Sequence, residues 1–182
     1  IIVDNDKLQS GKPIVDSFRP FDKVTVVYDV QDVKNISLTR NKAVELASGE
    51  YIFFIDDDEF ACKEWVTILL RTLEKYCADA VFGRVIPEFH AGAKEWMKKN
   101  SSGQRPSPPT GTIARHTRTS NCIVKAQLLK EIPGPFDPEY GISGGGDSHL
   151  FEKLRKTGAK YINSYEGWVS EIVPPERMTV NW

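Results

Sequence analysis

Several large classes of protein are excluded by what this sequence lacks. It has only three cysteines among 182 residues, and no two of them form a CxxC pair: they are Cys62, Cys77 and Cys122. A small and odd number of cysteines predicts a reducing compartment and no disulfide framework. No apolar run approaches the roughly 18 residues that a membrane-spanning helix needs. We therefore expect no membrane span.

The chain also lacks an excess of charge of one sign. Lys and Arg number 24 and Asp and Glu number 25, which leaves a net charge of −1 at pH 7. This balance argues against a protein that holds nucleic acid through phosphate contacts. The Walker phosphate loop, the G-x-S-x-G and H-E-x-x-H motifs and the dinucleotide fingerprint are absent as well. The sequence therefore gives no support for a nucleic-acid partner or for the enzymes that carry those motifs.

Short apolar runs that alternate with helical patterns make up most of the chain. Strands are expected over residues 1–3, 24–28, 51–55, 80–86, 121–124 and 161–162. Helices are expected over residues 37–48, 65–76, 127–131 and 147–157. Ser37 is the expected cap of the first helix and Gly49 its stop. The alternation predicts an α/β protein with a mostly parallel sheet, and the length predicts a single domain.

One stretch, residues 87–119, differs in kind from the rest. It is rich in proline, glycine and serine and carries the cations Arg105, Arg115 and Arg118. A loop this long in a compact domain is usually functional or disordered. We expect a flexible loop with one short helix near Trp96.

A run of four carboxylates, residues 56–59, follows the apolar strand expected over 51–55. In open α/β sheets, ligands bind at the carboxyl ends of the strands. Carboxylates at such an end suit a hard divalent cation such as Mg²⁺ or Mn²⁺. The alternative is an acidic turn in which Asp58 or Glu59 caps the next helix. The spacing alone favours the two interpretations equally.

A second candidate site is the glycine run 144–146, which leads into Asp147. Glycines allow the backbone to approach a ligand closely, and Asp147 stands at a helix start, where the dipole favours its charged form. Such a carboxylate can act as a general base. The alternative is that Asp147 only caps the helix, and the local sequence alone favours that alternative.

Acidic and basic residues near the start of the chain are weaker candidates for a binding site. Asp4 and Asp6 end the first strand, where a carboxylate can accept hydrogen bonds from a nucleotide base or ribose. Arg40 opens the first helix and can meet a phosphate. A polar turn and a solvated arginine are the simpler interpretations of these residues in isolation.

Four stretches, in this order, resemble segments of the bacterial family 2 glycosyltransferases, whose domain has the GT-A fold. They are 1–6, which ends in two acids; 38–52, similar to an "ARN…A-x-G-E-Y-I" segment; 54–59, with a DxD motif; and 144–147, similar to a "G-G-E-D" loop. The resemblance covers nearly the whole chain. It implies one GT-A domain over 1–182, with a mostly parallel, Rossmann-like sheet flanked by helices. A nucleotide-binding strand precedes these segments in the family, so we expect that strand upstream of Ile1.

The resemblance implies an inverting transfer of a sugar from a nucleotide-sugar to an acceptor hydroxyl, with Mn²⁺ or Mg²⁺ as cofactor. By analogy, Asp147 is the catalytic base and Asp58 the metal ligand. The nucleotide-sugar is expected to contact Asp4, Asp6, Arg40, Asp56 and Asp57. The implied acceptor is a glycan or lipid-linked glycan of polysaccharide biosynthesis. The implied location is the cytoplasm, at the inner face of the membrane where the protein associates peripherally.

The departures from the family pattern concern the acceptor side. Gly146 stands where the family often has glutamate, and Gly145 precedes it. Glu171 lies near the position of a metal-binding histidine found in many members, in a stretch similar to an "E-x-x-P-x-x-R" pattern that ends at Arg177. We expect these four residues on the acceptor side, with Glu171 as an oxygen ligand or an acceptor contact.

Two other functions remain open on the sequence. A sugar-phosphate nucleotidyltransferase would carry its glycine-rich phosphate loop near the start, in the segment expected upstream of Ile1. A non-catalytic module of the same fold would bind nucleotide or glycan without turnover, and Gly146 and the missing strand favour it slightly. The first would consume nucleoside triphosphate and sugar phosphate, whereas the second would consume nothing.

Overall fold

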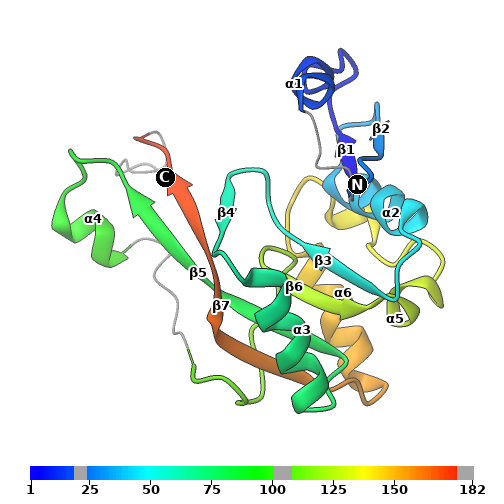
Figure 1. Ribbon diagram of the computed structural model, residues 1–182. Helices are drawn as coiled ribbons and strands as arrows, with labels where there is room; N and C mark the ends of the chain where they lie inside the picture. The colour runs from blue at the N-terminus through cyan, green and yellow to red at the C-terminus, as the bar shows by residue number, and fades with distance from the viewer. Residues whose placement is uncertain (19–23, 101–107, 176–182) are drawn as a thin grey trace. The chain divides into compact units, whose positions relative to one another are not determined.

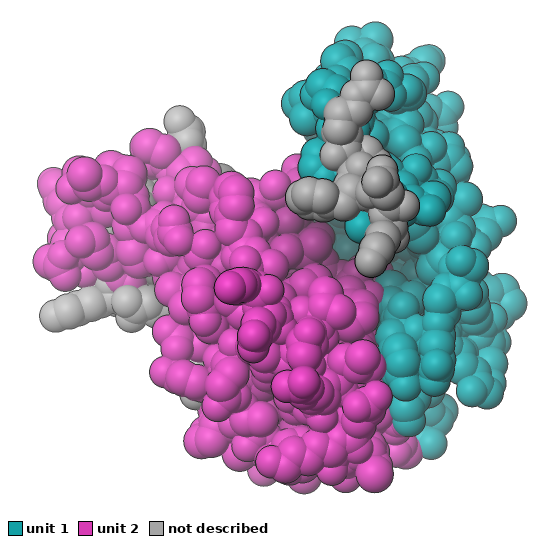
Figure 2. Space-filling view, in the orientation of Figure 1, with its two compact units in different colours: residues 1–52, 125–157 teal, residues 53–124, 158–182 magenta. Residues whose placement is uncertain are grey.

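The computed structural model describes residues 1–18, 24–100 and 108–175 of the chain. The chain forms two compact units, coloured separately in Figure 2: unit 1 consists of residues 1–52 and 125–157, and unit 2 of residues 53–124 and 158–182. Each unit therefore joins segments that are far apart in the sequence. In the described ranges, no helix combines the length and the apolar character needed to cross a membrane.

Unit 1 combines a two-stranded parallel sheet with several helices. Its elements are β1 (Ile2–Asp4), α1 (Lys12–Ser17), β2 (Tyr28–Val30), α2 (Ile36–Leu46), α5 (Ala126–Lys130), the 3-10 helix η1 (Pro138–Tyr140) and α6 (Gly146–Lys156) (Figure 1). Its buried apolar side chains include Val44, Leu129, Phe136, Leu150, Phe151 and Leu154. The helices expected over 37–48, 127–131 and 147–157 are confirmed as α2, α5 and α6, within a few residues at each end.

The cap of α2 is Asn35, so the predicted cap at Ser37 is wrong. The Asn35 side chain accepts a hydrogen bond from the Leu38 N–H at 3.0 Å. Ser37 is instead buried in the first turn, where a Cβ added to Gly146 would lie 3.1 Å from its hydroxyl oxygen. The helix ends before Gly49, so that glycine is not its stop. The cap that Asn35 supplies therefore places the start of α2 at Ile36.

The second strand is displaced from the predicted range 24–28. Its pairing with β1 sets its position, because the Ile2 N–H donates to the Val27 carbonyl at 2.8 Å and the Gln31 N–H donates to the Asp4 carbonyl at 2.8 Å. The β-branched run before Tyr28 therefore approaches the sheet without joining it, and only Tyr28–Val30 forms β2.

Unit 2 is organised by a five-stranded sheet with the order β3-β6-β5-β7-β4. The sheet and its helices comprise β3 (Tyr51–Phe54), β4 (Glu59–Ala61), α3 (Trp65–Lys75), β5 (Ala80–Phe89), α4 (Glu95–Asn100), β6 (Cys122–Lys125) and β7 (Tyr161–Val173). The division between the units falls within β3, after Ile52, and within β6, before Lys125. β5 and β7 are parallel, whereas β6 runs antiparallel to β5 and β4 antiparallel to β7. The sheet is therefore mixed, and the expectation of a mostly parallel sheet is corrected. Strand direction depends on which distant strand becomes the neighbour, which local pattern does not encode.

The last strand is much longer than the predicted residues 161–162. β7 follows β5 from Tyr161 to Val173, but a bulge interrupts the register. Gly83 pairs with Ser164 and Val85 pairs with Val169, so that Arg84 faces the four residues 165–168. The polar and glycine residues of this bulge break the apolar pattern, which is why the sequence indicates only a short strand.

Part of the stretch 87–119 is regular. β5 extends to Phe89, and the short helix expected near Trp96 is confirmed as α4. Further along, Ile113 forms an antiparallel bridge with Ile162 of β7. Residues 101–107 of the predicted loop lie outside the described residues.

A buried asparagine, Asn121, joins three elements of unit 2. Its Oδ1 accepts a hydrogen bond from the Trp65 Nε1 at 2.7 Å, and its Nδ2 donates to the carbonyls of Arg84 at 2.7 Å and Gly167 at 2.9 Å. Its φ of 52° lies in the left-handed region, which asparagine tolerates better than most residues. Asn121 thus ties helix α3 to both sides of the bulge between β5 and β7.

Candidate functional site

The acidic turn 56–58 connects β3 to β4 and is held in place by backbone hydrogen bonds. The Asp56 N–H donates to the Glu59 Oε2 at 3.0 Å, and the Ile172 N–H of β7 donates to the Asp58 carbonyl at 3.3 Å. Asp56 and Asp58 are half-buried, whereas Asp57 is exposed. The carboxylates that the sequence predicts after a strand therefore lie on a turn whose backbone is held by hydrogen bonds to the neighbouring strands.

Two further carboxylates join the turn from neighbouring strands. Glu59 and Glu171 are directly opposite each other in the β4–β7 pair, so their side chains leave the same face of the sheet. Glu59 is only 8% exposed. Burial raises the pKa of Glu59 to about 7, and the charges of Asp56 and Glu171 act in the same direction, whereas the hydrogen bond from Asp56 and the charge of Arg118 act against them. Sequence reasoning grouped Glu59 with a surface turn and missed its burial.

The donor set of this acidic cluster suits a hard cation. The turn offers the carboxylate oxygens of Asp56 and Asp58, and Glu171 stands opposite Glu59 on β7. Across the described ranges, no three His, Cys, Asp or Glu side chains are grouped closely enough to hold a metal by themselves. Mg²⁺ is usually held by one or two carboxylates and completes its shell with waters and substrate phosphates. The residues present fit a cation of that kind.

In unit 1, the glycine run forms a loop that only glycines adopt easily. Gly144 and Gly145 have φ values of 81° and 89°, in the left-handed region. Gly146 begins α6, and a Cβ there would lie 3.1 Å from the Ser37 Oγ, closer than most side chains approach. The glutamate that the family often has at this position therefore does not fit without a shift of its neighbours.

Asp147 lies in the first turn of α6, half-buried. Gly145 takes the N-cap position, so the alternative that Asp147 is only the cap is wrong. Its Oδ1 accepts a hydrogen bond from the Ser148 N–H at 2.8 Å.

Two asparagines attach α2 to the segment that precedes Asp147. Asn35 donates to the Pro138 carbonyl at 2.9 Å. Asn41 pairs with the backbone of Phe136, accepting from its N–H at 2.8 Å and donating to its carbonyl at 2.7 Å. Sequence reasoning missed both roles. For Asn41 the available signal was its place inside a predicted helix, where asparagine is unfavourable unless its amide has a partner.

The acids near the start of the chain order their own loop. Asp4 accepts hydrogen bonds from the Tyr28 hydroxyl at 2.8 Å, the Gly11 N–H at 3.0 Å and the Asp6 N–H at 2.9 Å. The bond from Tyr28 lowers the pKa of Asp4. Asp6 accepts from the Leu8 N–H at 2.9 Å, and that bond lowers the pKa of Asp6. Both side chains are therefore ionised at neutral pH.

The predicted site residues divide between the two units. Unit 1 holds Asp4, Asp6, Arg40, Gly145, Gly146 and Asp147, and unit 2 holds Asp56, Asp57, Asp58 and Glu171. The guanidinium of Arg40 lies over the Phe136 ring, 5.8 Å from its centroid. Arg177 lies outside the described residues.

Comparison with known proteins gives consistent matches. The model of the family described as "Glycosyl transferase family 2" matches residues 1–131. The chain is 31% identical over 183 residues to the succinoglycan biosynthesis protein ExoM of Rhizobium meliloti, covering all of this chain and 59% of that protein. It is 29% identical over 196 residues to a glucosyl-dolichyl phosphate glucuronosyltransferase of Haloferax volcanii, covering all of this chain and 61% of that protein. The chain thus spans about three fifths of the length of these curated relatives.

Solved structures confirm the GT-A fold. S. aureus TarS in complex with UDP matches with a TM-score of 0.62 at 18% identity, over 96% of this chain and 51% of that chain. GalNAc-T7 with UDP, GalNAc and Mn²⁺ matches with a TM-score of 0.64 at 11% identity, over 94% of this chain and 37% of that chain. At these identities the likeness establishes the arrangement of strands and helices alone.

Proposed function

Because the chain belongs to glycosyl transferase family 2, we propose that it transfers a sugar from a nucleotide-sugar donor to a hydroxyl group of an acceptor, with inversion at the anomeric carbon. The observation that carries the proposal is the acidic turn 56–58, which the sheet holds beside Glu171. The names of the two curated relatives support glycan synthesis as the setting. The acceptor that we propose is a glycan or lipid-linked glycan at the cytoplasmic side of a membrane.

We assign Asp58 as the residue that would hold Mn²⁺ or Mg²⁺, with Asp56 and Glu171 beside it. When bound, such a cation neutralises the diphosphate of the leaving group. The exposed Asp57 would orient the sugar or the ribose of the donor. A structure with the same fold contains UDP and Mn²⁺, which supports this assignment.

The nucleoside would bind at the acids of unit 1. A carboxylate offers about four lone-pair positions, and Asp4 uses three of them for Tyr28, Gly11 and Asp6. The remaining position would accept a hydrogen bond from the base, with Asp6 beside it and Arg40 near a phosphate. The ordered loop 4–11 would then present an ionised acceptor at little entropic cost.

Asp147 would act as the general base of a single displacement. The acceptor oxygen attacks the anomeric carbon, the bond from that carbon to the diphosphate oxygen breaks, and Asp147 takes the hydroxyl proton. A positioned base of this kind contributes about 10²–10⁴-fold to a rate. The glycines at 145 and 146 would leave room for the acceptor above the start of α6.

Two substitutions test this proposal, with nucleotide release and nucleotide binding as separate readouts. Asp147→Asn should lower turnover at least 100-fold while UDP, GDP, dTDP or CDP still raises the melting temperature in the presence of Mn²⁺. Asp58→Ala should abolish the Mn²⁺-dependent part of that shift. Glu152→Gln is the matched control, because Glu152 is an exposed carboxylate on the same helix, paired with Arg155.

Three outcomes would contradict the proposal. Normal turnover in Asp147→Asn would show that Asp147 is not the general base. Nucleotide binding without turnover in the unmodified chain, with every donor, would favour the non-catalytic module. Consumption of nucleoside triphosphate and sugar phosphate would favour the nucleotidyltransferase.

A further inference from the structure

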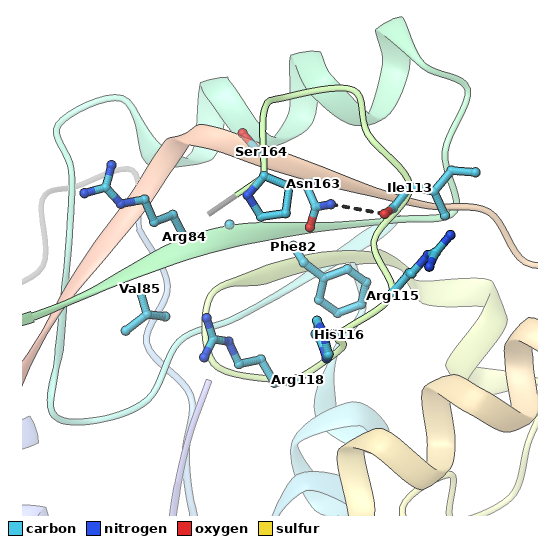
Figure 3. A pocket seen from close by; sticks show the side chains of 11 residues that line it. Phe82, Arg84, Val85, Ile113, Arg115, His116, Arg118, Asn163 and Ser164 are labelled. Atoms are coloured by element: carbon cyan, nitrogen blue, oxygen red, sulfur yellow. Dashed lines mark hydrogen bonds between the residues drawn. The ribbon is translucent and has the colours of Figure 1, made fainter. Parts of the chain in front are cut away.

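A cavity of about 490 Å³ lies in unit 2 beside β5, beyond the point where β6 stops pairing with that strand (Figure 3). This volume is within the roughly 300–1,000 Å³ of small-molecule sites. The walls combine the apolar side chains of Phe82, Val85 and Ile113 with four basic ones, Arg84, Arg115, His116 and Arg118. In Figure 3, His116 and Arg118 lie on the same side of β5 as the Phe82 ring.

The segment that supplies most of the basic residues is tied down at both ends. Before Arg115, the Ala114 N–H donates to the Tyr161 carbonyl at 3.0 Å, and the Asn163 N–H donates to the Thr112 carbonyl at 2.9 Å. After Arg118, the buried Asn121 accepts from the Gly83 N–H through its carbonyl at 2.9 Å. These bonds fix the backbone on both sides of residues 115–118, so the segment itself needs little further ordering when a ligand binds.

The charge of the cavity points to an anion. None of the described residues that line it is acidic, and three of them are arginines. Arg84 is steadied by the Tyr165 ring, whose centroid is 4.7 Å from the guanidinium carbon. Arginine binds phosphate and carboxylate groups through paired hydrogen bonds, and the apolar walls suit the ring faces or alkyl groups attached to such an anion.

The cavity and the acidic turn both belong to unit 2 and carry side chains of opposite charge. The charge of Arg118 reaches Glu59, where it opposes the rise in the pKa of that carboxyl. The proposed function places the donor diphosphate with the cation at the acidic turn, which leaves the acceptor as the substrate that would bring an anion to this cavity. We propose that this cavity binds an anionic group of the acceptor, a phosphate or a carboxylate next to an apolar or sugar-ring surface. The inference rests on the proposed function, since it assigns the class of its second substrate.

Calorimetric titration of the full chain in EDTA tests the proposal without a metal-dependent donor site. The anionic probes are geranyl diphosphate and methyl glucuronide, and their neutral counterparts are geraniol and methyl glucoside. At least one anionic probe should bind at least tenfold more tightly than its counterpart. Arg115→Gln and Arg118→Gln should each weaken it at least tenfold. Arg71→Gln, an exposed arginine of α3 outside the cavity, should bind as the unmodified chain does. The preferred probe decides between phosphate and carboxylate.

Four results would overturn the assignment, with circular dichroism confirming that each variant is folded. They are the absence of binding by both anionic probes, equal affinity for a probe and its neutral counterpart, and unchanged affinity in both arginine variants. A fourth is that Arg115→Gln weakens UDP with Mn²⁺ as much as the probe, which would place the donor in the cavity. Failure of the proposed function has a different signature, because UDP with Mn²⁺ would then not bind while the anionic probe still does.

Discussion

Replacement of Asn121 by alanine should remove a large part of the stability of unit 2. The side chain is fully buried and bonds to Trp65, Arg84 and Gly167, which belong to one helix and two strands. Alanine leaves one buried donor and two buried carbonyls without this partner. Each lost bond of this kind costs about 1 kcal/mol or more, so the three together cost about 3–4 kcal/mol.

The backbone adds a separate contribution. Asn121 has a φ of 52°, in the left-handed region, where alanine is less favourable than asparagine by roughly 1 kcal/mol because alanine lacks the short polar side chain that makes this conformation tolerable. The expected loss is therefore about 4–5 kcal/mol, against the 5–15 kcal/mol that separate the folded and unfolded states of typical domains. A variant this weak should unfold at much lower urea concentration than the unmodified chain.

Tryptophan fluorescence during urea denaturation measures this loss in the right part of the molecule. Three of the four tryptophans, Trp65, Trp96 and Trp168, lie in the described part of unit 2, and Trp182 lies outside the described residues. The midpoint should fall while the slope with urea stays the same, because the surface exposed on unfolding does not change.

Two control variants separate the contributions. Asn121→Gly loses the same hydrogen bonds without the left-handed cost, so it should be about 1 kcal/mol more stable than Asn121→Ala. Asn163→Ala, whose side chain makes longer bonds of 3.0–3.4 Å to Thr112 and Ile113 near the surface, should cost less than about 1 kcal/mol. If Asn121→Ala unfolds within 1 kcal/mol of the unmodified chain, the reasoning about this residue is refuted.

Two further predictions follow from the glycine loop and the acidic cluster. Gly141→Ala should lower the unfolding free energy of unit 1 by about 2–3 kcal/mol, because the new Cβ would stand 1.9 Å from the Asn35 Oδ1 and displace the cap of α2; unchanged hydrogen-exchange protection of the α2 amides would contradict it. Glu59→Gln should remove a pH dependence: the raised pKa of Glu59, from 4.5 to about 7, gives stability that is complete below pH 4.5 and is lost as the pH rises through 7. The difference between the two pKa values corresponds to roughly 3 kcal/mol of stability, which solvent screening reduces to about 1–2 kcal/mol. The measurement is the unfolding free energy against pH without divalent metal. Equal slopes for Glu59→Gln and the unmodified chain would show that burial of Glu59 has no such effect.

The sequence by itself determined the helices and helix ends that depend only on the spacing of neighbouring residues. The spacing of Trp65, Leu69 and Leu73 predicts the buried face of α3, and all three side chains are buried. Gly158 ends the helix expected over 147–157 and has a φ of 98°, as a glycine stop requires. The order of the four motif stretches was enough to identify the family, which the match over residues 1–131 confirms.

The candidate site residues were visible in the sequence for a related reason. Asp58 stood out because a run of carboxylates directly follows a predicted strand, and Asp147 stood out because a run of glycines leads into it at a predicted helix start. The roles of both residues remain proposals. The supporting residues Asn35 and Asn41 did not, because a side-chain amide reveals its importance only when its distant backbone partner is known.

Tertiary structure alone decided what depends on pairing across the chain. The direction of β4 and β6, the length of β7 and its bulge at 165–168 follow from register with distant strands. Burial of Glu59 follows from its place opposite Glu171, and the basic cavity exists because residues 115–118 are anchored to β7 and β5. Periodicity reports which face of one segment is apolar, whereas the neighbour, its direction and its register come from contacts between segments far apart in sequence.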